Sequence, residues 1–61
     1  DPKNGRAHMM AGYCALQLEQ LAEAKKSFQR AVRFKKERAE AKKMIAQIKR
    51  LQEAESFQQA L

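Results

Sequence analysis

The fold is decided by residues 7–31, which read AHMMAGYCALQLEQLAEAKKSFQRA. Small or apolar residues recur there at every third or fourth position, in two separate runs. The first run contains Ala7, Met10, Ala11, Cys14, Ala15 and Leu18. The second contains Leu21, Ala24, Phe28, Ala31 and Val32. This spacing is typical of helices that bury one face, so the stretch predicts two consecutive helices packed against each other.

A third run of the same kind follows, and it consists of Ala41, Met44, Ile45, Ile48 and Leu51. From residue 13 to residue 61 there is no Gly, Pro, Thr, Asn or Asp, and helix-forming residues dominate. The three runs predict helices over roughly residues 5–18, 22–35 and 38–57, with Asn4 as the N-cap of the first. The charged residues 35–38 form either a tight turn or one more turn of a continuous helix.

The third helix is predicted to be longer than its two partners. About 20 residues at 1.5 Å per residue extend for about 30 Å, whereas the first two helices have about 14 residues each. The C-terminal end of the third helix is therefore expected to overhang, without a partner inside the chain.

Length and composition exclude several classes of protein. A chain of 61 residues forms at most one small domain with a thin margin of stability. Cys14 is the only cysteine, so no disulfide forms within the chain, and a single free thiol suits a reducing, cytoplasmic compartment. The longest near-apolar stretch, residues 9–16, is shorter than the ~18–20 residues that span a bilayer. Because the chain starts with Asp1 rather than Met, we expect it to be a piece of a longer protein.

The positive charge is concentrated in one part of the chain. The net charge is +6, yet residues 25–50 hold eleven of the thirteen basic side chains and only two acidic ones, which gives 11 − 2 = +9. Such a block attracts acidic partners, which include proteins, nucleic acids and lipid head groups. A solvated helix surface is the simpler interpretation, because nucleic-acid binding usually adds interleaved aromatic residues.

The sequence offers little material for catalysis or for a metal site. His8 is the only histidine, and the hydroxyl groups are those of Tyr13, Ser27 and Ser56. A nucleophile needs a base and an orienting group, and these residues do not supply such a set. No catalytic, cofactor-binding or metal-binding residue is predicted. His8 is expected to be a half-exposed packing residue and Cys14 a small buried one.

The first two helices resemble a tetratricopeptide repeat, whose signature has the form W-x2-L-G-x2-Y…A-x3-F…P over 34 residues. Four residues occupy the structural positions of the signature: Gly12, Ala24, Phe28 and Ala31. A shift of 34 residues maps Ala7, Met10 and Gly12 onto Ala41, Met44 and Ala46, which indicates that the third helix is equivalent to the first. In the middle of a helix, Gly12 is expected to serve a close approach of the second helix.

The chain also departs from the signature in both turns and in the core. Glu19 stands in place of the turn glycine, and Lys36 in place of the closing proline. The large core residues of the family are replaced by His8, Ala11 and Ala15. The resemblance implies an all-α fold, in which an antiparallel helical hairpin is followed by a capping or next-repeat helix in a right-handed helical-repeat arrangement. The chain would be a single helical domain or a fragment of a larger repeat protein.

The same resemblance implies a non-enzymatic scaffold that binds a peptide or partner protein in a groove formed by the first and third helices, and the positive charge extends the candidates to acidic partners. Carried over residue by residue, the groove consists of Arg6, Met9, Met10, Tyr13, Lys43, Met44, Gln47 and Arg50. A wider face adds Leu16, Gln17 and Glu40. No cofactor, small-molecule substrate or membrane span is expected. The clamp for chaperone tails found in some repeats of this family is not expected, because Met10 and Tyr13 take its asparagine positions.

Two alternative functions remain open. One is a basic helical module that binds nucleic acid or another polyanion. The other is an oligomerisation element, because one and a half repeats do not cover their own apolar surface. The residues expected to be exposed, and to drive pairing of two copies, are Met9, Tyr13, Ile48, Leu51, Phe57 and Leu61.

Overall fold

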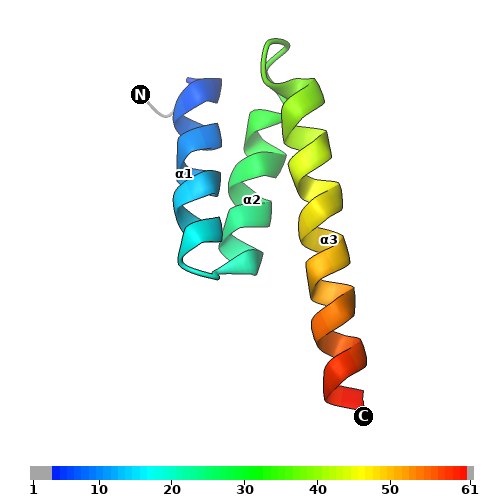
Figure 1. Ribbon diagram of the computed structural model, residues 1–61. Coiled ribbons are helices and arrows are strands. Elements are labelled where there is room, and N and C mark those ends of the chain that lie inside the picture. Colours follow the sequence, from blue (N-terminus) through cyan, green and yellow to red (C-terminus); the bar gives the residue numbers. More distant parts are fainter. Residues whose placement is uncertain (1–3, 61) are drawn as a thin grey trace.

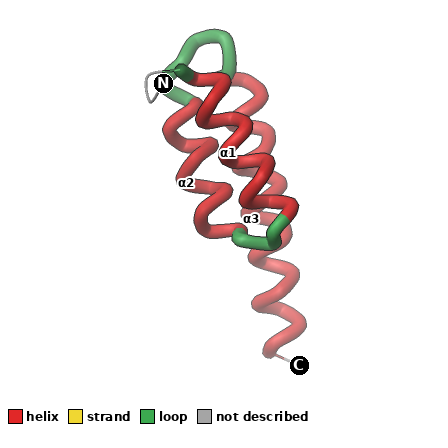
Figure 2. The backbone as a smooth tube through the Cα atoms, turned by 90° about the vertical axis from the view of Figure 1, so that its left-hand side faces the viewer, coloured by secondary structure: helices red, strands yellow, loops and turns green. Residues whose placement is uncertain are grey.

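Three helices in chain order make up the fold. They are α1 (Gly5–Gln17), α2 (Leu21–Ala31) and α3 (Arg38–Ala60). The structure is a computed structural model that describes the backbone of residues 4–60 and the side chains of residues 4–55. α2 runs antiparallel to both neighbours and packs on each of them (Figure 1). Seen from the side of α1, α3 lies behind α1, and α2 is offset from both (Figure 2). The prediction of an all-α fold is confirmed for the described residues.

α1 begins where the sequence predicts. The side-chain Oδ1 of Asn4 accepts a hydrogen bond from the backbone N–H of Arg6 at 2.9 Å. The carbonyl of Asn4 accepts a further bond from the N–H of Ala7 at 3.1 Å. These bonds satisfy N–H groups that otherwise have no partner in the first turn of a helix, so Asn4 is the N-cap.

α1 ends in a Schellman motif that is built without glycine. The N–H of Gln20 donates to the carbonyl of Ala15 at 2.9 Å, and the N–H of Glu19 donates to the carbonyl of Leu16 at 3.0 Å. Glu19 has φ 59°, which is the left-handed conformation that this motif requires. Such a conformation costs a non-glycine residue about 1–2 kcal/mol. The tight turn between α1 and α2 therefore keeps its geometry with an unsuited residue.

α2 ends at Ala31 and is shorter at its C-terminus than predicted. The N–H of Phe34 donates to the carbonyl of Ala31 at 3.0 Å, and the Nε of Arg38 donates to the carbonyl of Val32 at 3.0 Å. These bonds close a turn over residues 32–37, which separates α2 from α3. The turn begins early because Phe34 leaves the helix to pack beside α1. Of the two alternatives for the charged run, the separating turn is the correct one.

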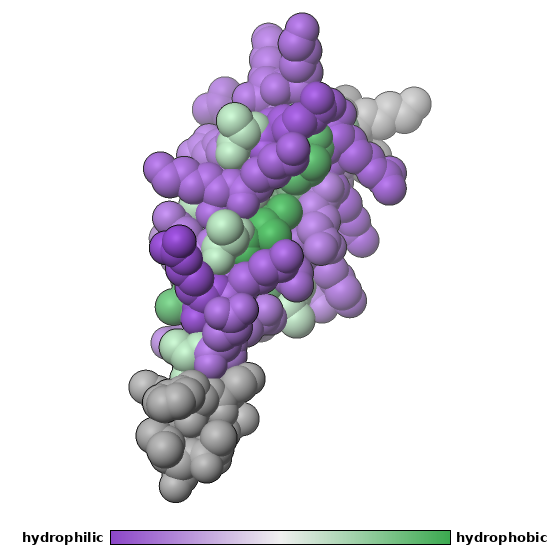
Figure 3. All heavy atoms as spheres, turned by 90° about the vertical axis from the view of Figure 1, so that its right-hand side faces the viewer, coloured by the Kyte–Doolittle hydropathy of each residue, from purple (hydrophilic) through white to green (hydrophobic). Residues whose placement is uncertain are grey.

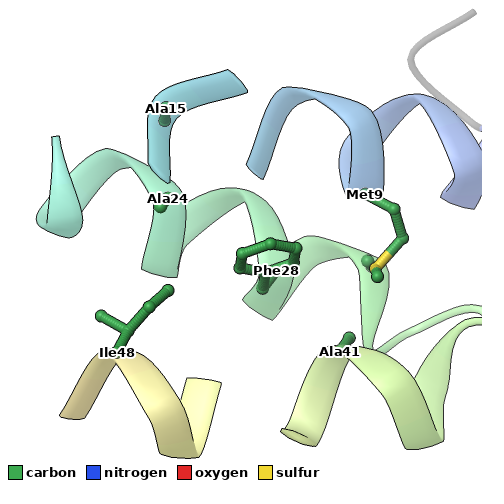
Figure 4. Close-up of a cluster of buried hydrophobic side chains, with 7 residues drawn as sticks. Met9, Ala15, Ala24, Phe28, Ala41 and Ile48 are labelled. Atoms are coloured by element: carbon green, nitrogen blue, oxygen red, sulfur yellow. The ribbon is translucent and has the colours of Figure 1, made fainter. Parts of the chain in front are cut away.

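The core lies on both sides of α2, as Figure 4 shows. Its buried apolar residues are Met9, Ala15, Ala24, Phe28, Ala31, Ala41 and Ile48. Phe28 and Ile48 are the largest side chains that are fully buried. Phe28 projects from α2 into the middle of the cluster, and Ile48 points from α3 towards α2. Burial of apolar surface stabilises a fold by about 25 cal/mol per Å². Each of these two large side chains therefore contributes more to stability than any of the buried alanines around it.

Two glycines of α1 make room for aromatic rings. A Cβ atom on Gly12 would lie 2.6 Å from Cε1 of Phe28, and one on Gly5 would lie 2.7 Å from Cβ of Phe34. Both distances are too short for a side chain, so each ring occupies the space that a glycine leaves. The ring of His8 packs on Phe34 with 5.9 Å between centroids. The predicted close approach at Gly12 is confirmed, and the group that approaches is the ring of Phe28.

The buried face of α1 agrees with the predicted stripe at Ala15 but otherwise differs from it. The buried residues are Gly5, Met9, Gly12 and Ala15, whereas Met10, Ala11, Cys14 and Leu18 are exposed. The predicted stripe consists of residues with methyl, thioether or thiol groups, and it does not include Gly5 or Met9. The rings of α2 and of the following turn instead pack against the side of α1 on which both glycines lie. The expectation that Cys14 is buried is therefore wrong, and the half-exposed packing position predicted for His8 is confirmed.

α3 extends past the ends of α1 and α2 at its C-terminus (Figures 1 and 2). It has 23 residues against 13 and 11 in its partners, so the predicted overhang is confirmed. Of the residues expected to be exposed, Leu51 is so, but Met9 and Ile48 are buried because they face α2. The side chains of Phe57 and Leu61 lie outside the described part. No helix within the described residues is long and apolar enough to span a membrane.

Candidate partner-binding surface

The predicted groove depends on whether α1 and α3 meet, and they do so through Tyr13. Its hydroxyl donates a hydrogen bond to Oε1 of Glu40 at 2.7 Å, across 27 positions of sequence. Its ring stands edge-on to Phe28, with 5.3 Å between centroids and 77° between planes. Tyr13 is therefore oriented by the core of α2 at its ring and by α3 at its hydroxyl. Contacts therefore lead from the ring of Phe28 on α2, through Tyr13 on α1, to the carboxylate of Glu40 on α3.

The carboxylate of Glu40 sets the acidity of this tyrosine. The hydrogen bond to Glu40 raises the pKa of Tyr13 above 10.0, and partial burial and the negative charge of Glu40 act in the same direction. All three effects favour the protonated phenol, which is the form that donates the bond. The link between α1 and α3 is thus intact through the whole neutral range.

The predicted groove residues differ in how much of them a partner can reach. Met9 is only 5% exposed and belongs to the core, so its assignment to a contact surface is not supported. Met10 is 59% exposed, while Tyr13 and Met44 are half-buried. The remaining predicted residues are exposed, and they are Arg6, Lys43, Gln47 and Arg50. The reachable set therefore combines apolar side chains with basic and polar ones.

The α3 residues of this set fall into two rows. A helix has about 3.6 residues per turn, so residues just before and just after a buried one lie on opposite flanks. Gln47 precedes the buried Ile48 and therefore lies on the same flank as Glu40, which faces α1. Lys43 and Arg50 each follow a buried residue by two positions, so they point away from α2 and form the outer rim.

The cations of this surface have no acidic partner among the described side chains. Among the described side chains, the ion pair is the one between Lys26 and Glu23, with 3.9 Å between Nζ and Oε1. Both residues belong to α2 and lie outside this surface. Glu40, the acidic residue nearest to the groove, is engaged by Tyr13. Arg6, Lys43 and Arg50 are therefore available to a negatively charged ligand.

Other residues with possible chemistry are dispersed. No three His, Cys, Asp or Glu side chains within residues 4–55 are grouped closely enough to hold a metal ion. Sequence reasoning missed the contact of Phe34 with Gly5. A signal for it was present, because Gly5 and Gly12 are seven residues apart and hence lie on one face of a helix.

Comparison with family models, with curated proteins and with solved structures finds no match to this chain. The interpretation of the surface therefore depends on its own contacts, above all on the bond between Tyr13 and Glu40.

Proposed function

We propose that this chain is a tetratricopeptide-like interaction module, with one repeat in α1 and α2 and the first helix of the next repeat in α3. It binds a peptide or a partner protein on the surface shared by α1 and α3, and it carries out no catalysis. The observation that supports this most is the hydrogen bond from Tyr13 to Glu40. It links the first and third helices, each of which packs on α2, and a repeat array of right-handed type has its groove between such helices.

The contact between α1 and α2 supports the same proposal. Gly12 receives the ring of Phe28, and Ala24 is fully buried on α2. In the resemblance, these are the glycine, the small residue and the aromatic residue of one repeat. The turn at Glu19 adds a further agreement, because its left-handed φ of 59° suits the glycine that the signature places there.

The chemistry of the surface indicates the kind of segment that it binds. Met10 and Met44 offer polarizable side chains that adapt to different apolar shapes. Arg6, Lys43 and Arg50 add unpaired positive charge to the same surface. A segment with one or two apolar anchors flanked by carboxylates fits this arrangement, because each carboxylate pairs with a cation that is already exposed.

The proposal is tested by selecting a displayed library of random peptides against the protein and measuring the affinity of the recovered peptides by fluorescence anisotropy. The groove variant carries Met10→Glu and Lys43→Glu. The control carries Leu18→Glu and Lys42→Glu, which changes the charge equally at an exposed apolar residue and an exposed lysine outside the groove.

Recovered peptides are expected to be rich in acidic residues next to apolar ones. The groove variant should bind them at least about tenfold more weakly, whereas the control should stay within about threefold of the wild-type protein. Equal losses in the two variants would contradict the proposal, since binding would then follow net charge rather than this surface.

A further inference from the structure

The basic side chains of residues 25–50 are divided between two faces of the molecule. All of them except Lys25 are exposed. Lys43 and Arg50 form the rim of the groove described above. The others lie on α2, on the turn after it and on the far flank of α3, and their placement follows from which residues are buried.

On α2, the basic residues lie opposite the core. Lys26 and Arg30 each follow a buried residue, Ala24 or Phe28, by two positions, which is a little more than half a turn. Lys26 is partly neutralised by Glu23 at 3.9 Å. Arg30 is exposed and has no ion pair with a described acidic side chain.

On α3, two lysines lie on the flank that faces away from α1. Lys42 and Lys49 directly follow the buried Ala41 and Ile48. Glu40, which directly precedes Ala41, is bonded to Tyr13 and so marks the flank that faces α1. Residues before and after a buried position lie on opposite flanks, so the two lysines are on the side away from the groove.

The turn between α2 and α3 joins these two sets. Arg33, Lys35 and Lys36 are all exposed in it. Along the chain they lie between the two sets. The exposed cations of these three segments are called the outer basic face, which consists of Arg30, Arg33, Lys35, Lys36, Lys42 and Lys49. Two acidic residues adjoin it in the sequence: Glu37, which directly follows Lys36 and lies beside Gly5, and Glu53, one turn beyond Lys49. Figure 3 looks at the molecule from the side of α3 and shows hydrophilic residues over most of that view.

We propose that the outer basic face binds the phosphate backbone of nucleic acid without reading its bases. Its cations are spaced along two neighbouring helices, for example Lys42 and Lys49 about 10 Å apart along α3 at 1.5 Å per residue. Such a row follows a linear array of phosphates and releases its counterions. The proposal is independent of peptide binding, because the face shares no residue with the groove.

Two other modes of binding, insertion into an anionic membrane and base stacking on single strands, need side chains that are not found among the described residues of this face. Insertion into an anionic membrane needs exposed apolar side chains. Among the side chains of residues 4–55, the large exposed ones are Met10 on α1, Leu18 in the turn between α1 and α2, and Leu51 on the α1 flank of α3. Binding of single strands by base stacking needs exposed aromatic rings, but among the described side chains Phe28 is buried and Phe34 is half-buried against Gly5.

The experiment compares two variants of equal charge. The outer-face variant carries Arg30→Gln, Lys42→Gln and Lys49→Gln. The second variant, called the groove-glutamine variant, carries Arg6→Gln, Lys43→Gln and Arg50→Gln. All six positions are exposed and glutamine favours helix, so both variants are expected to fold, which circular dichroism checks. The probe is a fluorescent DNA duplex of random sequence, titrated between about 50 and 200 mM salt.

The wild-type protein is expected to bind the duplex with a steep dependence on salt. The outer-face variant should lose at least about tenfold in affinity and about 2.7 in the slope of log K against log salt, since each lost phosphate contact contributes about 0.9. The affinity of the groove-glutamine variant for the duplex should stay within about threefold of that of the wild-type protein. A second duplex of different sequence should bind equally well.

Three outcomes would overturn the proposal. Absence of duplex binding at about 50 mM salt removes it outright, because electrostatic binding is strongest there. Equal losses of duplex affinity in the two variants would show that binding follows the net charge of the protein and not the outer basic face. Tighter binding to phosphatidylserine vesicles than to the duplex assigns the face to a membrane surface.

Discussion

The two sides of α2 are packed by different means. Towards α1, the contact interlocks, because the ring of Phe28 occupies the space above Gly12 and a second ring, that of Phe34, lies against Gly5. Towards α3, the contact is made by aliphatic groups, with Ala41 and Ile48 pointing at α2 (Figure 4). A ring against a glycine tolerates no added atom, whereas aliphatic packing tolerates exchange at constant volume. The α1–α2 pair is therefore the strictly specified unit, and α3 is the more adaptable one.

The two connections show the same contrast. The α1–α2 connection is a three-residue turn in a fixed motif, held by Glu19 in a left-handed conformation. The α2–α3 connection is twice as long and covers residues 32–37, and it is fixed by Phe34 against Gly5 and by the bond from Arg38 to the carbonyl of Val32. The short connection is therefore fixed by backbone hydrogen bonds, whereas the longer one also uses the side chains of Phe34 and Arg38.

The largest expected effect is on the interlocked side. Phe28→Ala should lower the free energy of unfolding by about 3–5 kcal/mol, since the ring is fully buried and the surrounding helices cannot collapse into its space. Ile48→Ala, its counterpart on the α3 side, should cost less, within about 2–4 kcal/mol. Urea denaturation followed by circular dichroism measures both. An equal or reversed order would show that the α3 contact is as strictly specified as the α1 contact.

The sequence predicted what depends on neighbours along the chain. The three helices, the N-cap at Asn4 and the role of Gly12 follow from local spacing, and all of them are confirmed. Apart from Ala15, the buried face of α1 was predicted wrongly, because Ala, Met and Cys residues occur on both sides of this helix and hydropathy does not rank a glycine as buried. The outcome was decided by Phe28 and Phe34, which come from other elements.

The candidate surface was predictable to a lesser degree. The exposure of Met10 and the half-burial of Met44 agree with contact roles, but Met9 belongs to the core. The bond between Tyr13 and Glu40 spans 27 positions. It depends on how α3 lies against α1, and no periodicity within one helix contains that information.

A smaller effect, of opposite sign, is expected in the turn of the interlocked unit. Glu19→Gly should raise the free energy of unfolding by about 1 kcal/mol, because glycine adopts the left-handed conformation at φ 59° without steric cost. Glu19→Ala is the control, since it removes the same charge and keeps a Cβ atom. It should give no gain, as measured by thermal melting of both variants. A gain of equal size in the alanine variant would mean that the charge, and not the backbone, limits stability there.

The smallest expected effect concerns the point where the strict unit meets the adaptable one. Tyr13 is the only tyrosine in the chain, so the ultraviolet absorbance of tyrosinate reports on it alone. Because the bond to Glu40 raises its pKa in the folded state above 10.0, the bond stabilises the fold fully at pH values below the ordinary tyrosine pKa. That contribution is lost as the pH rises through the higher folded-state pKa, when the phenol loses the proton that it donates. Glu40→Gln should bring the pKa of Tyr13 back towards its ordinary value, and Glu53→Gln, which removes the same charge elsewhere on α3, should leave it raised. If the two variants shift it equally, the link between α1 and α3 is a general effect of charge, and the groove loses the contact that holds its two halves together.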